Sequence, residues 1–157
     1  MKRKKLTASM IALVMSVSLP MTTYAANWYL EDGSVTVNAD NSGQTVTQGG
    51  TSTPDEAPVI TQRESSVETG NTIAINASDN AAANVTIKDI NIKSSKDAID
   101  VTGSSSANIT LEGDNKIFSE TGSALHVSDG NVTINGSGSL KAEIQDDLGS
   151  DYNHNAK

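Results

Sequence analysis

The sequence predicts an all-β fold, a single-stranded parallel β-helix in which one chain winds into stacked turns. The strings at 84–87 (NVTI), 108–111 (NITL) and 131–134 (NVTI) begin 24 and then 23 residues apart. Within each string apolar residues alternate with threonine, which is the period of a strand. A second series of apolar residues is spaced by 26 and 26 residues: Ile73, Ile99 and Leu125.

Stacking these strands places like residues on like, at the spacing of about 4.8 Å between neighbouring strands. The predicted inward columns are Val85/Ile109/Val132, Ile87/Leu111/Ile134, Ile92/Ile117/Leu140, Ile73/Ile99/Leu125 and Ile75/Val101/Val127. The crossover rule favours a right-handed coil. A β-sandwich also contains many short strands, but it does not explain such equal spacings.

The chain begins with features of a secretory signal peptide. A basic segment at 2–5 (KRKK) precedes an apolar run at 6–19, and small residues precede a cleavage site after Ala25. We therefore predict a signal peptide at 1–25. The run is shorter than a membrane span needs and is followed by Pro20, so we expect no membrane segment in the mature chain.

The mature chain divides into three parts by its pattern. We expect an N-terminal cap and first rungs at 26–70, regular rungs at 71–143 and an irregular tail at 144–157. In the first part Trp28 and Tyr29 are candidates for a cap, which a solenoid needs at each end. Val35, Val37, Val59 and Ile60 indicate short strands, and the composition of 49–54 indicates a loop. The tail offers no such cap, which leads to the expectation of a longer parent protein or of a tail that folds over the end.

Charge and composition exclude several classes of partner. All 19 acidic residues but only 7 of the 11 basic ones follow Ala25, so the mature chain has a formal charge of −12. Nucleic acids and anionic membranes need a basic surface, so neither is an expected partner. The absence of cysteine leaves backbone ladders and an aliphatic core to stabilise the fold.

Several matched polar residues have structural interpretations. Asn84, Asn108 and Asn131 begin the repeated strings and can form a ladder of side-chain amides. Outward columns are also predicted. Their members are Lys88/Glu112/Asn135, with an ion pair between the first two, and Ala74/Asp100/His126, with a contact between the last two.

Carboxylates collect at the predicted corners of the coil. Asp97, Asp100 and Asp129 adjoin strands that stack, so their oxygens are the best candidates for a calcium site. Calcium is a hard cation that takes 6–8 oxygen ligands. The alternative is that these carboxylates are simply solvated.

The sequence gives little indication of catalysis. β-Helices include pectin lyases and polygalacturonases, which need a basic proton abstractor or paired carboxylates. The one arginine beyond the signal peptide, Arg63, lies outside the regular rungs, and the pair Asp146 and Asp147 lies in the tail. We therefore expect a protein that is not an enzyme.

In the order of its short sequence segments, the chain resembles a family of secreted bacterial β-helical carbohydrate-binding domains. The segments are WYLEDGSVTV, QTVTQGG, APVITQRES, NVTIKDINI, AIDVTG, NITLEGDNKI and NVTINGSGSLKA, within 28–142. One branch of that family binds polygalacturonate and carries calcium in a right-handed parallel β-helix. In similar proteins the next segment is glycine-rich and continues the helix.

The resemblance implies a secreted or cell-surface, non-catalytic module that binds polysaccharide, with polygalacturonate as the candidate ligand. A chain of charge −12 repels an acidic sugar, and a bridging Ca²⁺ would remove that conflict. The alternatives are a structural stalk or adhesin segment of a larger surface protein and, less favoured, a pectin-degrading enzyme.

Overall fold

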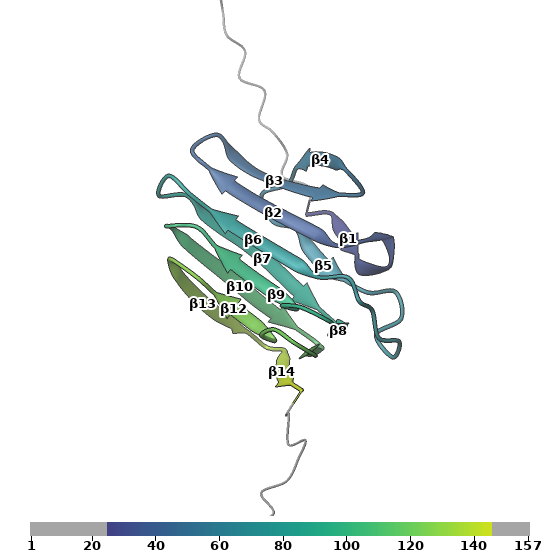
Figure 1. Cartoon of the computed structure of the whole chain (residues 1–157). Coiled ribbons are helices and arrows are strands. Elements are labelled where there is room, and N and C mark those ends of the chain that lie inside the picture. Colours follow the sequence, from purple (N-terminus) through teal and green to yellow (C-terminus); the bar gives the residue numbers. More distant parts are fainter. Residues whose placement is uncertain (1–24, 146–157) are drawn as a thin grey trace, which may run out of the picture.

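The protein is an all-β parallel solenoid of about three turns, as a computed structural model that describes residues 25–145 shows (Figure 1). The predicted fold class is therefore confirmed. The signal peptide predicted at 1–25 and the tail predicted at 144–157 lie almost wholly outside the described residues. Within 25–145 no helix is long and apolar enough to cross a membrane.

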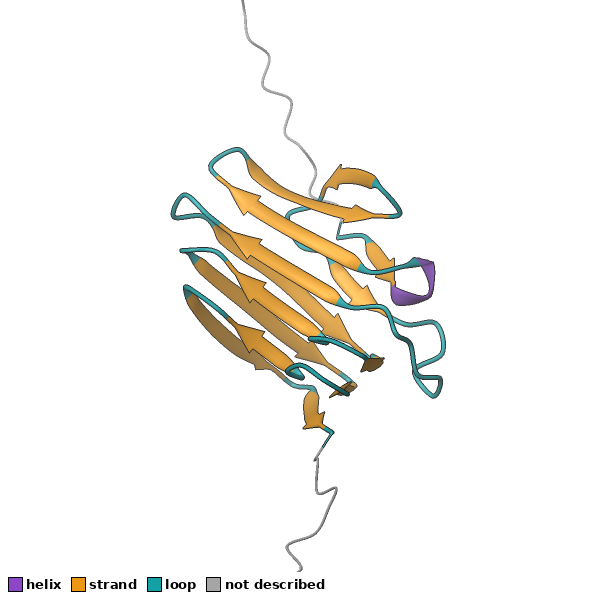
Figure 2. Cartoon of the chain, viewed as in Figure 1, coloured by secondary structure: helices purple, strands orange, loops and turns teal. Residues whose placement is uncertain are grey.

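The strands, orange in Figure 2, form three sheets named A, B and C. From residue 73 onward the chain visits sheets B, A and C in that order in each turn, whereas the earlier residues contribute no strand to sheet C. Sheet A contains, in spatial order, β1 (Asn27–Tyr29), β5 (Val59–Thr61), β7 (Ala82–Lys88), β10 (Ser106–Glu112) and β13 (Asn131–Gly136). Sheet B contains β12 (Leu125–Val127), β9 (Ile99–Thr102), β6 (Ile73–Ala77), β2 (Val35–Asp40), β3 (Gly43–Gln48) and β4 (Thr51–Pro54). Sheet C contains β14 (Ser139–Ile144), β11 (Asp114–Ser119) and β8 (Asn91–Ser94).

The core consists of aliphatic columns between the three sheets. In sheet B, Ile73, Ile99 and Leu125 are stacked in register as predicted, and Val35 extends their column by one strand. The column of Ile75, Val101 and Val127 is confirmed by the same pairings. Alternation explains this arrangement, because every second side chain of a strand points to the same face.

In sheets A and C the predicted register of the last rung is wrong by two residues, whereas β12 in sheet B keeps the predicted one. Ile109 pairs with Ile134, where the repeated strings place Val132, and Ile117 pairs with Ala142, where they place Leu140. A shift of two residues keeps the same side chains pointing inward, so the apolar pattern cannot detect it. Asn131 consequently pairs with Ser106 rather than with Asn108.

A glycine contact is consistent with the observed register. Gly136 pairs with Leu111, and a Cβ added to Gly136 would lie 2.2 Å from the carbonyl oxygen of Leu111. Its φ of 111° is also a conformation that glycine adopts readily. Glycine therefore suits this position, whereas the string-based register places Ile134 opposite Leu111.

The N-terminal end is closed by antiparallel strands that the sequence did not predict. Strand β3 pairs antiparallel with both β2 and β4. The segment 49–54 was expected to be a loop, but Thr51–Pro54 forms β4. Gly49 and Gly50 have φ values of 59° and 80°, as the two central residues of a tight hairpin require.

Buried polar groups join this cap to the first rung. Gln44 is 2% exposed, and its side-chain amide donates to the carbonyl oxygens of Asp55 and Asn84. Trp28 Nε1 donates to the buried Asp55 carboxylate at 2.8 Å. The predicted capping role of Trp28 is thus supported by its place over the core.

The other end of the solenoid is open within the described residues. The last strand of each sheet is β12, β13 or β14, and none of these has a partner on its outer side within 25–145. Large apolar side chains are consequently exposed there: Val127 at 43%, Ile134 at 42% and Ile144 at 60%.

Candidate functional site

The outer face of sheet C combines an aromatic ring with three lysines. This face consists of the outward side chains of β8, β11 and β14: Asn91, Lys93, Asp114, Lys116, Phe118, Ser139, Lys141 and Glu143. It carries three of the seven basic residues that follow Ala25. In a chain of net charge −12 its three lysines are matched by Asp114, Glu143 and the adjacent Glu68, which lies 3.9 Å from Lys93.

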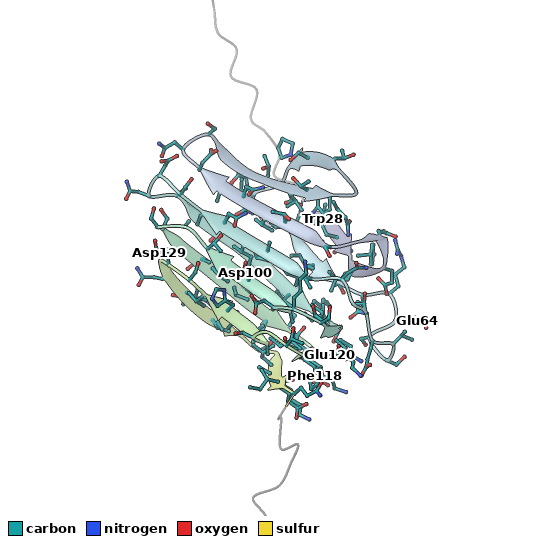
Figure 3. All side chains as sticks on the ribbon, in the orientation of Figure 1. Trp28, Glu64, Asp100, Phe118, Glu120 and Asp129 are labelled. Carbon is teal, nitrogen blue, oxygen red and sulfur yellow. The ribbon has the colours of Figure 1, made fainter. Side chains whose placement is uncertain are left out.

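Phe118 points outward because its neighbours point inward. Asn115, Ile117 and Ser119 are buried, and the alternation of the strand turns Lys116 and Phe118 to the other side. Figure 3 shows Phe118 at the lower end of the molecule, beside β14. The sequence analysis did not consider this ring, although the alternation of 115–119 places it on the surface.

The lysines of this face differ in their partners. Lys93 Nζ lies 5.8 Å from the centre of the Phe118 ring and 3.9 Å from Glu68. Lys141 lies 3.0 Å from Glu143. Lys116 is exposed, pairs in register with Asn91 and Lys141, and makes no ion pair with the described residues. A cleft of about 200 Å³ on this face is lined by Lys93, Lys116 and Phe118 and by the carboxylates of Glu68 and Glu143.

A second concave region lies beside β1 and the end of β7. Arg63 forms two hydrogen bonds to Asp32, at 2.9 and 2.7 Å, and its guanidinium lies 4.0 Å from the centre of the Tyr29 ring. The hydrogen bond from Arg63 lowers the pKa of the Asp32 carboxyl. Lys88 forms the predicted ion pair with Glu112, at 3.1 Å. Both cations of this region are paired, as are Lys93 and Lys141 of sheet C, whereas Lys116 of sheet C has no ion pair with the described residues.

The predicted acidic corner is only partly assembled. Asp97 and Asp100 lie close together, and the third member of their cluster is His126 rather than Asp129. Figure 3 shows Asp129 at the turn on the left, apart from Asp100 on the central strand. Asp129 is exposed, and one of its oxygens accepts from the backbone of Gly130.

His126 is bonded to Asp100, as the column of Ala74, Asp100 and His126 predicts. His126 Nδ1 lies 2.8 Å from an Asp100 oxygen and 3.9 Å from an Asp97 oxygen. The hydrogen bond to Asp100 raises the pKa of His126, and the negative charge of Asp97 adds to the effect.

This corner fits calcium poorly. It offers two carboxylates and an imidazole, whereas calcium prefers a shell made of oxygens alone. An Asp97 oxygen also accepts from the backbone N–H of Ser123 at 2.6 Å. Calcium binding through Asp97, Asp100 and Asp129 therefore stays a prediction, and no step of the proposed function depends on it.

The polar ladders have structural roles. Asn108 donates its side-chain amide to Asn84 at 3.0 Å, which confirms the first step of the predicted asparagine ladder. The predicted third members are wrong, because Asn131 pairs with Ser106 and Asn135 pairs with Thr110. The shift of the last rung by two residues accounts for both corrections. The pair Asp146 and Asp147 lies outside the described residues.

Comparison with known proteins adds no family to this description. No protein-family model matches the chain, and neither a curated protein nor a solved structure is significantly similar to it. The structure itself shows the fold, an all-β parallel solenoid of about three turns.

Proposed function

We propose that this chain is a secreted or cell-surface, non-catalytic module that binds an acidic polysaccharide on the outer face of sheet C. The observation that carries the proposal is the half-buried Phe118 ring, with Lys93 5.8 Å from its centre and the in-register pair of Lys116 and Lys141 on the same face. An aromatic face suits the apolar side of a sugar ring, and lysines suit carboxylates. Polygalacturonate, the ligand of one branch of the family that the sequence resembles, has both features.

The regular geometry of the sheet suits a repeating ligand. Lys116 and Lys141 are paired in register on neighbouring strands, which lie about 4.8 Å apart. Each exposed ion pair contributes only about 0–1 kcal/mol, so useful affinity requires several contacts along one polymer. The predicted binding is therefore weak for short oligosaccharides, stronger for long ones and sensitive to salt.

The lysines offer a route to acidic sugars that needs no metal. The whole mature chain repels a polyanion, but charges farther away than about 10 Å are largely screened at 0.1 M salt. At the face itself Asp114, Glu143 and the adjacent Glu68 offset the three lysines, so the attraction is assigned to Lys116, which makes no ion pair with the described residues. The calcium-bridging hypothesis makes the opposite prediction, because it requires a cation between protein and sugar carboxylates.

A glycan array and a pull-down on polygalacturonate test the proposal. Mature protein should be retained by polygalacturonate, less by a neutral galactan, and equally with and without a chelator. Retention that disappears with chelator would instead support calcium bridging. The Phe118→Ala variant should lose most binding, whereas Tyr29→Ala, the matched aromatic control on another face, should keep it.

Two other outcomes would change the assignment. If neither the array nor the pull-down detects a glycan, the proposal fails and the stalk or adhesin interpretation gains support. Release of reducing sugar or of unsaturated products from polygalacturonate would show a pectin-degrading enzyme and contradict the non-catalytic proposal.

A further inference from the structure

We propose that the open end of the solenoid is an interface with a second copy of this chain, in which the two β14 strands pair antiparallel about Ala142. The proposal goes beyond carbohydrate binding and does not depend on it. It rests on the exposed apolar residues of the last rung, on the free edge of β14 and on the sequence of that strand.

The last rung exposes apolar surface that the other rungs bury. Residues equivalent to Ile134 and Val127 in the rung above, Ile109 and Val101, are 2% exposed. Ile134, Val127 and Ile144 are 42%, 43% and 60% exposed. Apolar side chains beside unpaired strand edges are a site where another chain can add.

The backbone of β14 has a defined set of free groups. The N–H of Ser139 donates to Gly113, just before β11, and the N–H of Gln145, just after β14, donates to Ser119 of β11. Backbone groups alternate in direction along a strand, so those of Leu140, Ala142 and Ile144 point away from β11. These three residues are available to a second strand.

In an antiparallel pairing centred on Ala142, the free backbone groups of Leu140, Ala142 and Ile144 all form hydrogen bonds with the second copy. Ala142 then faces Ala142 of the second copy, and Leu140 faces Ile144. These are the hydrogen-bonded pairs of the new ladder, and their side chains are on the core side of the sheet. Lys141 and Glu143 of one strand are 3.0 Å apart. On the outer side of the dimer each also faces the opposite charge of the second copy, so two lysines and two glutamates gather in one cluster.

The charge of the end also favours self-association. The three last strands, β12, β13 and β14, contain one lysine, one glutamate and one histidine as their only titratable side chains. The interface is therefore nearly neutral although each chain is strongly acidic. A two-fold axis through Ala142 also sets the β13 edge of one copy against the β12 edge of the other.

A closed dimer follows rather than a fibre. Head-to-tail stacking would need the N-terminal end, where sheet B finishes in β4, an exposed polar strand that contains Pro54. End-to-end pairing uses the same surface on both copies, which closes the assembly at two. Sheet C would then have six strands, and its outer face would be doubled.

Light scattering after size exclusion, over a wide range of protein concentrations, tests the proposal on the whole mature chain. The expected result is a molar mass that rises to twice that of one chain. Ala142→Pro should keep the protein monomeric, because it removes an edge N–H while leaving the bonds to β11 intact. Circular dichroism confirms that the variant is folded.

Charge reversal tests the register. Lys141→Glu and Glu143→Lys should each weaken the dimer about tenfold, and the double variant should restore it. Lys88→Glu, which changes an exposed and likewise ion-paired lysine in sheet A, should have no effect. A monomer at every concentration would overturn the proposal and point to residues 146–157 as the cover of the end. A dimer whose stability is unchanged by both charge reversals and by Ala142→Pro would overturn the proposal too.

Discussion

Ile134 of β13 pairs with Ile109 of β10, two residues away from Leu111, the partner that the repeated strings assign to it. The register of the last rung thus departs from the repeat in the sequence. Because the chain contains no cysteine, engineered pairs of cysteines can measure this register directly.

We predict that Thr110→Cys with Asn135→Cys forms a disulfide on mild oxidation. The two residues are paired in register, and Thr110 Oγ1 donates to Asn135 Oδ1 at 3.1 Å. Adjacent strands bring the two Cα atoms within the 4.4–6.8 Å that a disulfide accepts. Mass spectrometry under non-reducing conditions detects the bond.

The matched control is Thr110→Cys with Thr133→Cys, the pair that the repeated strings would place together. It should remain reduced under the same conditions. A disulfide in the control and not in the first pair would restore the string-based register and contradict the structure.

The register of the strands was predictable where the apolar repeat allows only one alignment of neighbouring strands. The columns of sheet B could be assigned because Ile73, Ile99 and Leu125 recur at a constant spacing of 26. The last rung could not be assigned, because slipping a strand by two residues leaves its apolar face inward. The antiparallel β3 and β4 were missed because their residues have no counterpart in the repeat.

The candidate site was less predictable than the fold. Asp97 and Asp100 were correctly expected to lie near each other, but Asp129 is at a different turn. Corner residues vary in position with the length of each turn, which the apolar period does not determine. Phe118 was not considered as a site residue, although the alternation of 115–119 places it on the outer face of its strand.

A substitution at Gly103 should separate close packing from backbone strain. Gly103 has a φ of 99°, and a Cβ there would lie 2.1 Å from the carbonyl oxygen of Ala77. Gly33 has a φ of 127° with no atom near its added Cβ. We predict that Gly33→Ala costs about 1–3 kcal/mol from strain alone and that Gly103→Ala costs more. Urea denaturation of both variants measures the difference, and equal losses would contradict the proposed contact.

The buried carboxylate of Asp55 should contribute to the stability of the N-terminal cap. It accepts from Trp28 Nε1 at 2.8 Å and from the backbone N–H of Ala57 at 3.1 Å. Asp55→Ala leaves these donors without an acceptor and should lower the free energy of unfolding by about 1–3 kcal/mol. Asp55→Asn keeps an oxygen at the site and should lose less. Equal destabilisation by both variants, measured in urea, would argue against the hydrogen bonds.

His126 should make stability depend on pH. Its pKa is raised in the folded protein by Asp100 first and Asp97 next, so protonation favours the folded state. That stabilisation is complete below the pKa of the unfolded chain, about 6.5, and is lost as the pH rises through the higher folded value. His126→Gln should therefore destabilise the protein more at low pH than at high pH. Thermal unfolding of both proteins between about pH 5.5 and 9 checks this, and a constant difference would count against the imidazolium contact.

The most direct test of the proposed function is the affinity of polygalacturonate for variants of the outer face of sheet C. Isothermal titration should show Lys116→Glu binding about tenfold more weakly than the unmodified mature chain, since one attraction becomes a repulsion. The matched reversal Lys88→Glu, at a lysine already paired with Glu112, should change the affinity little. Equal affinities for all three proteins, or an equal loss in both variants, would contradict the assignment of the sugar to this face.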